Sequence, residues 1–551
     1  MFVWVRKTLP MFSRPAAWRC AGVFAVAIFA CLVARFWHPY YGFTRFIQLD
    51  EWDARVGISE VRTHRVFVYP GENGYDGAAY AQIAFHPSLD SPELSTAISQ
   101  LPYRARRILT SALAYMFAAG NPARIADVYS WINIGAWLVF AVVLWRALSV
   151  RDLRTFCLWF GVTFSSGALH SVRLALTDLL ATTLACLAVL ISERSNPARG
   201  GVFLAAAGLA RETALAQVVG LWRGPWTSVR TWAVNVAITV LVAAPLFAWM
   251  AYVRVRAGSA PPGFGNFSWP LVDWFIKGAN ILADFWREPN FRWLVTTTLL
   301  AHIALTAQAA FFITRRHLAD PWWRIGLGGA VLMLFLGEAV WEGHPGAATR
   351  VLLPMSAAFA VLAARQAASW PWVLVAGLSM FSGVLALVHV THDVRELDAG
   401  QFSGGAYVAR HGDGWHGVEF SGRQRWAWSP GRAELQFETA RRTSRDYNVE
   451  LRLRGFGERP LEIRDAHGVR WQGRLATGRE WIRFGAVSDD SGRIRLTLIS
   501  ASPPQPESAA ASARPLSFAL DGARLVPIEN RRLDRRTPLI ETPPAPRSTL
   551  R

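Results

Sequence analysis

Long apolar stretches recur through the first 391 residues, separated by shorter polar segments. Most are close to the roughly 20 residues that a helix needs to cross a bilayer, so the pattern predicts membrane spans. The first, Trp18–Phe36, follows Arg6, Lys7 and Arg14, which favours a retained span with a cytoplasmic N-terminus over a cleaved signal peptide. Eight further spans are expected at 126–147, 153–169, 173–192, 231–253, 291–313, 323–341, 348–365 and 370–391.

Basic loops should lie on the cytoplasmic side after every second span. The chain keeps this alternation only if two of its apolar segments do not cross the membrane fully. The short stretch 108–119 is placed at the outer face. The segment 200–222 is expected to enter the membrane and return as two half-helices, which is tolerated where backbone is buried in protein or lines a wet cavity. The alternative is a single crossing that breaks the positive-inside pattern. The chain is thus expected to have about ten membrane segments and to lie in a bacterial inner membrane. The loops 37–107 and 254–290 would then face the periplasm.

From about residue 400 the hydrophobic pattern changes to a period of two, as in Ala433, Leu435 and Phe437. Turn signals such as 489–492 and Asp521-Gly522 separate these runs, which predicts an antiparallel β-sandwich. The expected fold is thus a polytopic α-helical membrane protein with a C-terminal all-β, jelly-roll-like domain. Its parts are a cytoplasmic N-terminus at 1–16, a transmembrane domain at 17–397, a periplasmic sandwich at 398–529 and a disordered tail at 530–551.

Composition supports the membrane interpretation and narrows the partners. The 551 residues include 58 basic and 39 acidic ones, so the formal net charge is +19, yet 52% of the chain is hydrophobic. A nucleic-acid binder would explain the charge but not the apolar excess, so no nucleic-acid partner is expected. All cysteines lie in apolar stretches without metal-ligand spacing and are interpreted as small core residues: Cys20, Cys31, Cys157 and Cys186.

The long loop 37–107 carries the first candidate for catalysis, Asp76. The residues after Gly77 look helical, so Asp76 would lie at a helix start, where free N–H groups and the helix dipole keep a carboxylate ionised. A fixed, ionised carboxylate can act as the general base for a hydroxyl acceptor. Tyr80 lies one turn further along the same face. The structural alternative is that Asp76 is only a helix N-cap.

A second acidic group, 50–53, follows the first span and includes Glu51. A carboxylate here could assist catalysis or bind a metal. The alternative is a solvated acidic turn, because no histidine or further aspartate lies at ligand spacing. No metal site is therefore assigned and no cofactor is expected. The acidic group would still be compatible with a divalent metal ion.

Charged and aromatic residues near the expected periplasmic ends of the spans are candidates for substrate binding. Arginine suits bidentate phosphate recognition, whereas the alternatives are anchoring to lipid headgroups and salt bridges between helices. Arg173 and Asp178 are expected to open one helix, 173–192, and to find partners on other helices. Several charges facing one side favour a shared polar cavity. The candidates are Tyr80, Tyr103, Arg104, Arg107, Arg173, Asp178, Arg211, Glu212, His344 and Arg350.

The order of these motifs resembles the GT-C superfamily of integral-membrane glycosyltransferases, and a bacterial subgroup within it. The similarity covers most of residues 17–391, and no single motif is decisive. The chain has no P-loop, no Rossmann glycine motif, no GxSxG elbow and no HExxH pair. Soluble nucleotide chemistry therefore has no visible site in the sequence. The matching runs are Gly74-Tyr75-Asp76-Gly77, 80–84, His86-Pro87, 103–109, 172–178, 209–213 and 348–354.

The resemblance implies transfer of a sugar from a polyprenyl-phosphate donor to the hydroxyl of a periplasmic glycan, lipid or protein acceptor, usually with inversion. Asp76 would then take the acceptor proton, and arginines would hold the phosphate leaving group. Many members carry an Asp-Glu pair after the first span, here Asp50-Glu51, so Glu51 competes with Asp76 for the catalytic role. The C-terminal sandwich resembles the jelly-roll-like domains appended to such enzymes.

Two other classes of function fit part of the pattern. A transporter or flippase of lipid-linked glycans would also use intramembrane charges, and inverted repeats would support it, but none is apparent. A non-catalytic, membrane-anchored protein could present the β-domain to glycans. The long first loop with an acid at a helix start favours the enzyme, because a transporter would not need it.

Overall fold

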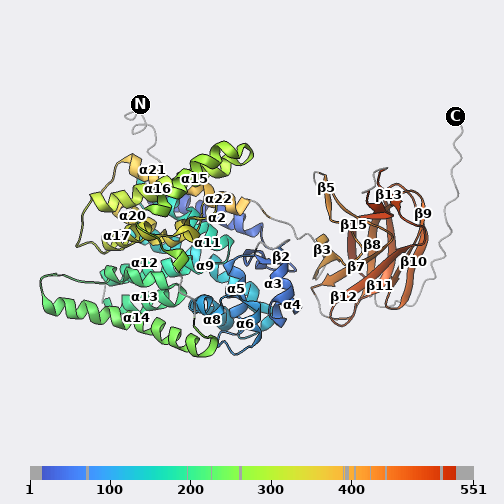
Figure 1. Cartoon of the computed structure of the whole chain (residues 1–551), viewed down its shortest axis with the longest axis horizontal. Helices are drawn as coiled ribbons and strands as arrows, with labels where there is room; N and C mark the ends of the chain where they lie inside the picture. The colour runs from blue at the N-terminus through green and yellow to red at the C-terminus, as the bar shows by residue number, and fades with distance from the viewer. Residues whose placement is uncertain are drawn as a thin grey trace. The chain divides into compact units, whose positions relative to one another are not determined.

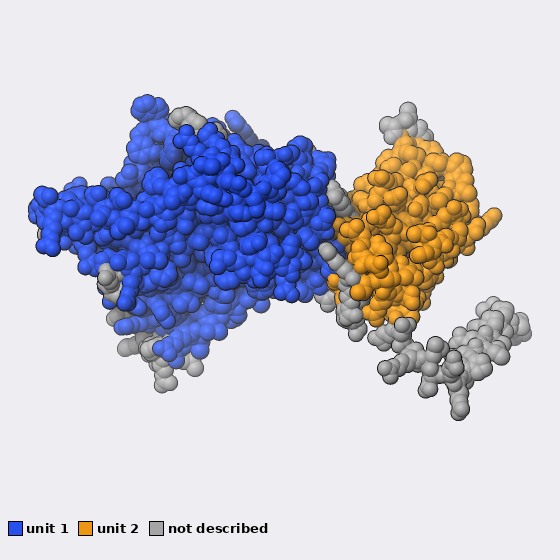
Figure 2. Space-filling model, turned by 90° about the horizontal axis from the view of Figure 1, so that it is seen from below, with its two compact units in different colours: residues 1–393 blue, residues 394–551 orange. Residues whose placement is uncertain are grey.

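The computed structural model separates the chain into two compact units, Met1–Asp393 and Val394–Arg551 (Figure 2). The expected tail at 530–551 and all but the last two residues of the expected N-terminal segment 1–16 lie outside the described residues. The structure describes residues 15–69, 74–194, 197–224, 226–259, 264–388, 390, 396–402, 405–421, 424–440, 443–508 and 513–528.

The first unit is helical (Figure 1). Its α-helices are α2 Pro15–Ala34, α3 Glu51–Val56, α4 Ser59–Thr63, α5 Asp76–Ile83, α6 Glu93–Ala97, α7 Leu101–Arg104, α8 Ile108–Phe117, α9 Pro122–Leu148, α10 Leu153–Thr163, α11 Ser166–Arg173, α12 Asp178–Arg194, α13 Pro197–Ala210, α14 Val229–Ala257, α15 Val272–Arg287, α16 Arg292–Thr314, α17 Pro321–Phe335, α18 Glu338–Trp341, α19 Ala348–Val351, α20 Leu353–Arg365, α21 Trp370–Gly377 and α22 Met380–Val388. The 3-10 helices are η2 Thr44–Phe46, η3 Glu212–Gly220, η4 Phe264–Asn266 and η5 Pro289–Phe291, and two short strands, β1 Leu49–Asp50 and β2 Val68–Tyr69, pair in parallel.

Five helical segments among the described residues are long and apolar enough to cross a membrane. They are Ala16–Ala34, Pro122–Leu148, Val229–Ala257, Pro289–Thr314 and Trp370–Val388. The other segments expected to cross are shorter or interrupted helices. The structure therefore supports a helical unit of membrane type, but it does not show ten crossings.

The expected span 153–169 is divided into α10 and α11, because Ser165 adopts an extended conformation and its hydroxyl accepts a hydrogen bond from the Ala168 N–H at 3.4 Å. The expectation that Arg173 and Asp178 open one helix is wrong. Arg173 is the last residue of α11, and Asp178 is the first residue of α12. The chain turns between them, so the two side chains start from different helices.

The segment 200–222 consists of α13, a break at Arg211 and the 3-10 helix η3. The backbone of Arg211 is extended, with φ −155° and ψ 125°, which ends the α-helix. Beyond the break, η3 packs back on α13 through an apolar cluster that includes Leu204, Ala207, Ala214 and Val218. The chain therefore reverses direction at the charged pair Arg211-Glu212.

The outer surface of the helical unit is apolar over long stretches. The helix α14 lies along one edge of the unit beside α13, and Leu241 and Val255 on it are exposed (Figure 1). Cys20 and Cys31 on α2 are also exposed, so the expectation that all cysteines are core residues is wrong for these two. Both helices are candidate membrane spans, and large exposed apolar surfaces mark contact with lipid or protein.

The short helix α5 is enclosed within the unit, since its residues from Gly77 to Ile83 are buried. A Cβ atom at Gly77 would lie 2.2 Å from the backbone oxygen of Leu174 and 3.0 Å from that of Ile47. Glycine therefore allows the start of α5 to rest directly on the turn between α11 and α12. This contact fixes the positions from which Asp76 and Tyr80 project.

The second unit is an antiparallel β-sandwich, which confirms the expected β-rich domain. One sheet has the order β10-β9-β12-β7-β4-β3 and the other β11-β8-β15-β6-β5, and apolar residues from both form one core. The strands are β3 Glu396–Phe402, β4 Gly405–His411, β5 Glu419–Ser421, β6 Gln424–Ser429, β7 Arg432–Thr439, β8 Asp446–Gly455, β9 Arg459–Asp465, β10 Gly468–Leu475, β11 Glu480–Val487, β12 Arg493–Ser500, β13 Gln505–Pro506, β14 Pro515–Leu516 and β15 Phe518–Pro527.

The interpretation of Asp521-Gly522 as a turn between strands is wrong. Both residues lie inside β15, where the pairing with β8 shifts register between Leu520 and Gly522. The Asp521 carboxylate forms ion pairs with Arg454 at 3.2 Å and Arg479 at 2.9 Å. A β-bulge therefore uses the same residue types that mark a turn in sequence.

Replacing Gly77 by alanine is expected to destabilise the helical unit by about 1–3 kcal/mol, because the added methyl group would overlap two backbone oxygens. Gly135 in α9 is the matched control, since a Cβ atom there meets nothing within 4 Å. Thermal unfolding in detergent should show a lower midpoint for Gly77→Ala and an unchanged or higher midpoint for Gly135→Ala. Equal midpoints would contradict the close contact at Gly77.

Candidate functional site

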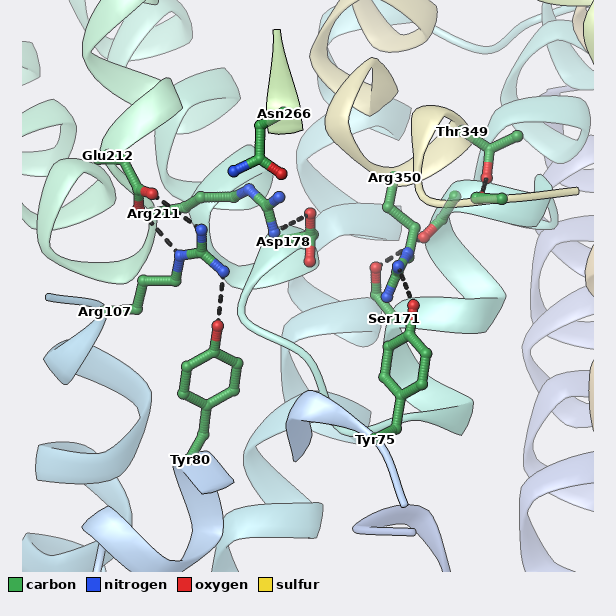
Figure 3. Close-up of polar contacts among 12 residues, drawn as sticks. Tyr75, Tyr80, Arg107, Ser171, Asp178, Arg211, Glu212, Asn266, Thr349 and Arg350 are labelled. Atoms are coloured by element: carbon green, nitrogen blue, oxygen red, sulfur yellow. Dashed lines mark hydrogen bonds and ion pairs between the residues drawn. The ribbon is translucent and has the colours of Figure 1, made fainter. Parts of the chain in front are cut away.

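The centre of the polar network is the Arg107 guanidinium, which is buried immediately before α8 (Figure 3). Its Nε and Nη2 donate to the two carboxylate oxygens of Glu212 at 2.9 and 2.8 Å, which is a bidentate pair. Nη1 also donates to the Tyr80 hydroxyl at 2.5 Å, and Nη2 to the Tyr103 hydroxyl at 3.1 Å. The Asn266 side chain donates to the same Tyr103 oxygen at 3.1 Å. One cation thus joins η3, α5 and α7, and Tyr103 connects it to η4.

Burial raises the pKa of the Tyr80 hydroxyl well above its ordinary value, although the nearby Arg107 charge acts in the opposite direction. Tyr80 therefore stays protonated at neutral pH and serves as a hydrogen-bonding group. The charges of Asp76, Arg211 and Glu212 also act on this hydroxyl, so candidate residues from three parts of the chain share one neighbourhood.

A second ion pair joins the two points where the chain turns. The Arg211 Nη1 atom lies 2.5 Å from Oδ1 of Asp178, whose side chain is only 2% exposed (Figure 3). Asp178 opens α12, and Arg211 occupies the break between α13 and η3. Because a buried carboxylate is costly when its charged partner is missing, this pairing favours the arrangement in which the break lies beside the start of α12.

Asp76 is the most accessible of the three ion-paired carboxylates. Its side chain is 40% exposed, and its Oδ1 accepts a hydrogen bond from Arg104 at 3.1 Å. Arg104 is held in place by the backbone oxygen and the hydroxyl of Ser99, at 2.7 and 2.8 Å. The N-cap of α5 is Tyr75, and Asp76 is the first helical residue, so the alternative that Asp76 serves only as an N-cap does not describe this helix.

Two further arginines of the candidate set interact with aromatic rings. Arg350, buried in α19, donates to the Tyr75 hydroxyl at 2.6 Å and lies 5.2 Å from the centre of that ring. Arg173 lies over the rings of Phe36 and Tyr69, at 5.1 and 5.4 Å. Within the described ranges no carboxylate pairs with either guanidinium, unlike Arg104, Arg107 and Arg211. Both cations therefore retain charge that an anionic ligand could neutralise.

The acidic group at 50–53 lies in the same loop, 37–107, as Asp76. Asp50 is the N-cap of α3 and accepts from the Asp53 N–H at 2.8 Å, while its second oxygen accepts from the Gly74 N–H at 2.8 Å. Asp50 thereby ties down the segment that leads to Asp76. Glu51, the first residue of α3, is partly exposed.

Burial, together with the charge of Asp50, raises the pKa of Asp53 to about 6, and Arg104 opposes this shift. Arg104 therefore lies within electrostatic reach of Asp53 and in contact with Asp76. The two acidic motifs that compete in sequence for one role belong to one connected region, in which Asp50 positions the chain and Asp53 has a raised pKa.

His344 lies apart from these contacts, in a cavity of about 170 Å³. Its Nδ1 is 3.3 Å from the Thr298 hydroxyl, and the cavity wall also contains Lys277 and Glu342. Sequence reasoning missed three residues that the structure brings forward. Tyr75 is adjacent to Asp76, and Lys277 is one of only two lysines in the chain, whereas nothing in the sequence marks Asn266.

Neither a scan of protein-family models nor a search of curated proteins found a match to this chain. Among the residues that the structure describes, no group of three or more His, Cys, Asp or Glu side chains has the geometry to hold a metal ion. The fold and site define a helical protein, with five helices able to cross a membrane in the part of the chain that the structure describes, a β-sandwich unit, and a polar network in which an accessible carboxylate contacts an arginine.

Replacing Glu212 by glutamine is expected to lower the thermal unfolding midpoint strongly, corresponding to about 2–4 kcal/mol, because it leaves the buried Arg107 charge uncompensated. Glu193→Gln is the matched control, since Glu193 pairs with the more exposed Arg365 and such pairs contribute about 0–1 kcal/mol. A midpoint for Glu212→Gln as high as that of Glu193→Gln would show that the network does not stabilise the fold.

The raised pKa of Asp53 predicts a pH dependence of stability. Because the folded protein holds this proton up to about pH 6 and the unfolded chain releases it near 3.8, folding loses stability as the pH rises between these values. Asp53→Asn removes this loss. The midpoint difference between variant and wild type should therefore grow in favour of the variant from about pH 4 to pH 7. Parallel midpoint profiles would refute the raised pKa.

Proposed function

We propose that this protein is a glycosyltransferase of the GT-C type, embedded in a bacterial inner membrane through about ten segments, with its site and β-sandwich facing the periplasm. It transfers a sugar from a polyprenyl-phosphate donor to an acceptor hydroxyl on a glycan, lipid or protein. The acceptor oxygen bonds to the anomeric carbon as the bond to the phosphate breaks. Asp76 takes the acceptor proton, and the polyprenyl phosphate leaves with its charge stabilised by arginine.

The observation that carries the proposal is the setting of the Asp76 carboxylate. It is fixed at the start of α5, remains partly exposed and contacts Arg104. The neighbouring Tyr75 connects it to Arg350. A base for a hydroxyl needs access and a fixed position, and a phosphate leaving group needs cations nearby. Asp178 and Glu212 meet these needs less well, because each is committed to a more buried ion pair.

The charge balance of the network supports the same assignment. Arg107 and Arg211 have carboxylate partners and serve to hold α5, η3 and α12 together. Arg350 and Arg173 are the cations best suited to a phosphate, because they contact aromatic side chains and no carboxylate among the described residues pairs with them. Guanidinium groups bind phosphate oxygens in a bidentate manner, and bound phosphate would add charge-assisted hydrogen bonds that these residues lack.

The test is transfer of labelled sugar from polyprenyl-phosphate donors to candidate acceptors by purified protein in lipid. Asp76→Asn should reduce the rate by about 10²- to 10⁴-fold, the usual contribution of a general base. The matched control is Asp90→Asn, which makes the same chemical change at an exposed carboxylate of the same loop. Its rate should remain at the wild-type value, and all variants should unfold at similar temperatures.

Glu51→Gln separates the two acidic motifs. We expect it to retain activity close to wild type, because Asp76 is the base. Loss of activity in Glu51→Gln with full activity in Asp76→Asn would transfer the catalytic role to Glu51. Full activity in both variants, measured with a donor that the wild type uses, would contradict the mechanism.

A further inference from the structure

The loop 254–290, placed outside the membrane by its sequence, contains a helix with an inverted distribution of side chains. On α15 the exposed side is apolar: Phe275, Leu282 and Trp286 are 62%, 59% and 74% exposed. They recur at intervals of seven and four residues, which places them on one face of the helix. A helix in water would turn this face toward the protein.

The opposite face of α15 is polar and lies along a cavity, with Lys277 buried, Asp273 and Asp284 half-buried and Asn280 exposed. Asp273, Lys277, Asn280 and Asp284 follow each other at intervals of four, three and four residues, and all line the cavity of about 170 Å³ against α18. The Lys277 ammonium is buried and donates to the backbone oxygen of Gly343 at 2.6 Å. The charged groups of α15 thus have protein partners or a cavity to face.

The depth of α15 follows from its packing on α16. The two helices form an antiparallel pair joined by η5, and near this turn Arg292 Nε donates to the Phe285 oxygen at 3.3 Å. Away from the turn, the Trp274 indole donates to the Thr306 hydroxyl at 3.0 Å and stacks on His302. Thr306 lies 14 residues after Arg292, which is about 21 Å along a helix of about 34 Å.

Because the hydrocarbon core of a bilayer is about 30 Å thick, a crossing α16 carries Thr306 well inside it. The end of α15 that contacts Thr306 is then at membrane depth as well. Trp286 and Arg287 lie at the other end of α15, near the turn, where aromatic and basic residues mark the interface with water.

We infer that α15 is immersed in the bilayer beside α16 and presents Phe275 and Leu282 to lipid acyl chains without crossing the membrane. It thereby separates the cavity around Lys277 from lipid. The hydrogen bond from Lys277 to Gly343 connects α15 to the turn that leads to α19. Lipid on one face of α15 thus helps to hold the turn that the opposite face contacts. This inference depends on α16 crossing the membrane and not on the catalytic proposal.

Spin labels on cysteines test this placement in the full chain reconstituted in phospholipid nanodiscs, after the four native cysteines are replaced by alanine. Oxygen concentrates in the hydrocarbon region, whereas a water-soluble nickel chelate stays outside it. The ratio of collisions with oxygen to collisions with the chelate should be several-fold higher at Phe275→Cys and Leu282→Cys than at Val469→Cys, which replaces an exposed apolar residue of the β-sandwich.

Two further labels calibrate the measurement. Leu241→Cys on α14 represents an exposed position of a candidate span, and Asn280→Cys represents the polar face of α15. Phe275→Cys and Leu282→Cys should resemble Leu241→Cys. Ratios equal to that of Val469→Cys would place α15 in water and overturn the inference. Low collision rates with both reagents would also overturn it, because a second protein copy would then cover this face.

Discussion

The buried guanidinium of Arg107 is the interaction on which the arrangement of the helical unit depends. Removing a cation from water is costly unless its donors are satisfied, and here a bidentate carboxylate and two tyrosine hydroxyls satisfy them. These partners come from segments more than one hundred residues apart, Tyr80 and Glu212 among them. Since the cost of an unpaired charge is avoided only if all of them meet, the cation fixes how α5, α7 and η3 lie relative to each other.

The same physical constraint explains where the helices break. Arg211 follows the last residue of α13, and Asp178 begins α12 after a turn from Arg173, so the charged groups lie at helix ends instead of along continuous spans. Helix ends leave backbone groups without intrahelical partners, which favours polar surroundings. Charges and broken helices therefore occur together, and the accessible carboxylate of Asp76 lies among them while the outer surface stays apolar.

Much of the fold could be predicted from single residues and their spacing. Period-two runs such as that of β7 identified the β-unit, and apolar length identified α9, α14 and α16. The interruption at Arg211-Glu212 pointed to the break after α13. The sequence failed where a local signal has two meanings. Asp521-Gly522 resembles a turn in sequence but forms a bulge inside β15. The segment 153–169 resembles one continuous span, whereas Ser165 caps a second helix, α11, within it.

Most candidate site residues were recognised by their type, because charged side chains in apolar surroundings are costly and therefore informative. Their pairing was beyond the sequence. Arg107 with Glu212, Arg211 with Asp178 and Asp76 with Arg104 are partners chosen by packing. By itself the sequence determined which segments are apolar, which alternate and where charge interrupts them, since these follow from local spacing. Only the tertiary structure decided which charges meet and how far each is exposed, because burial and the cost of unpaired charge depend on all the helices at once.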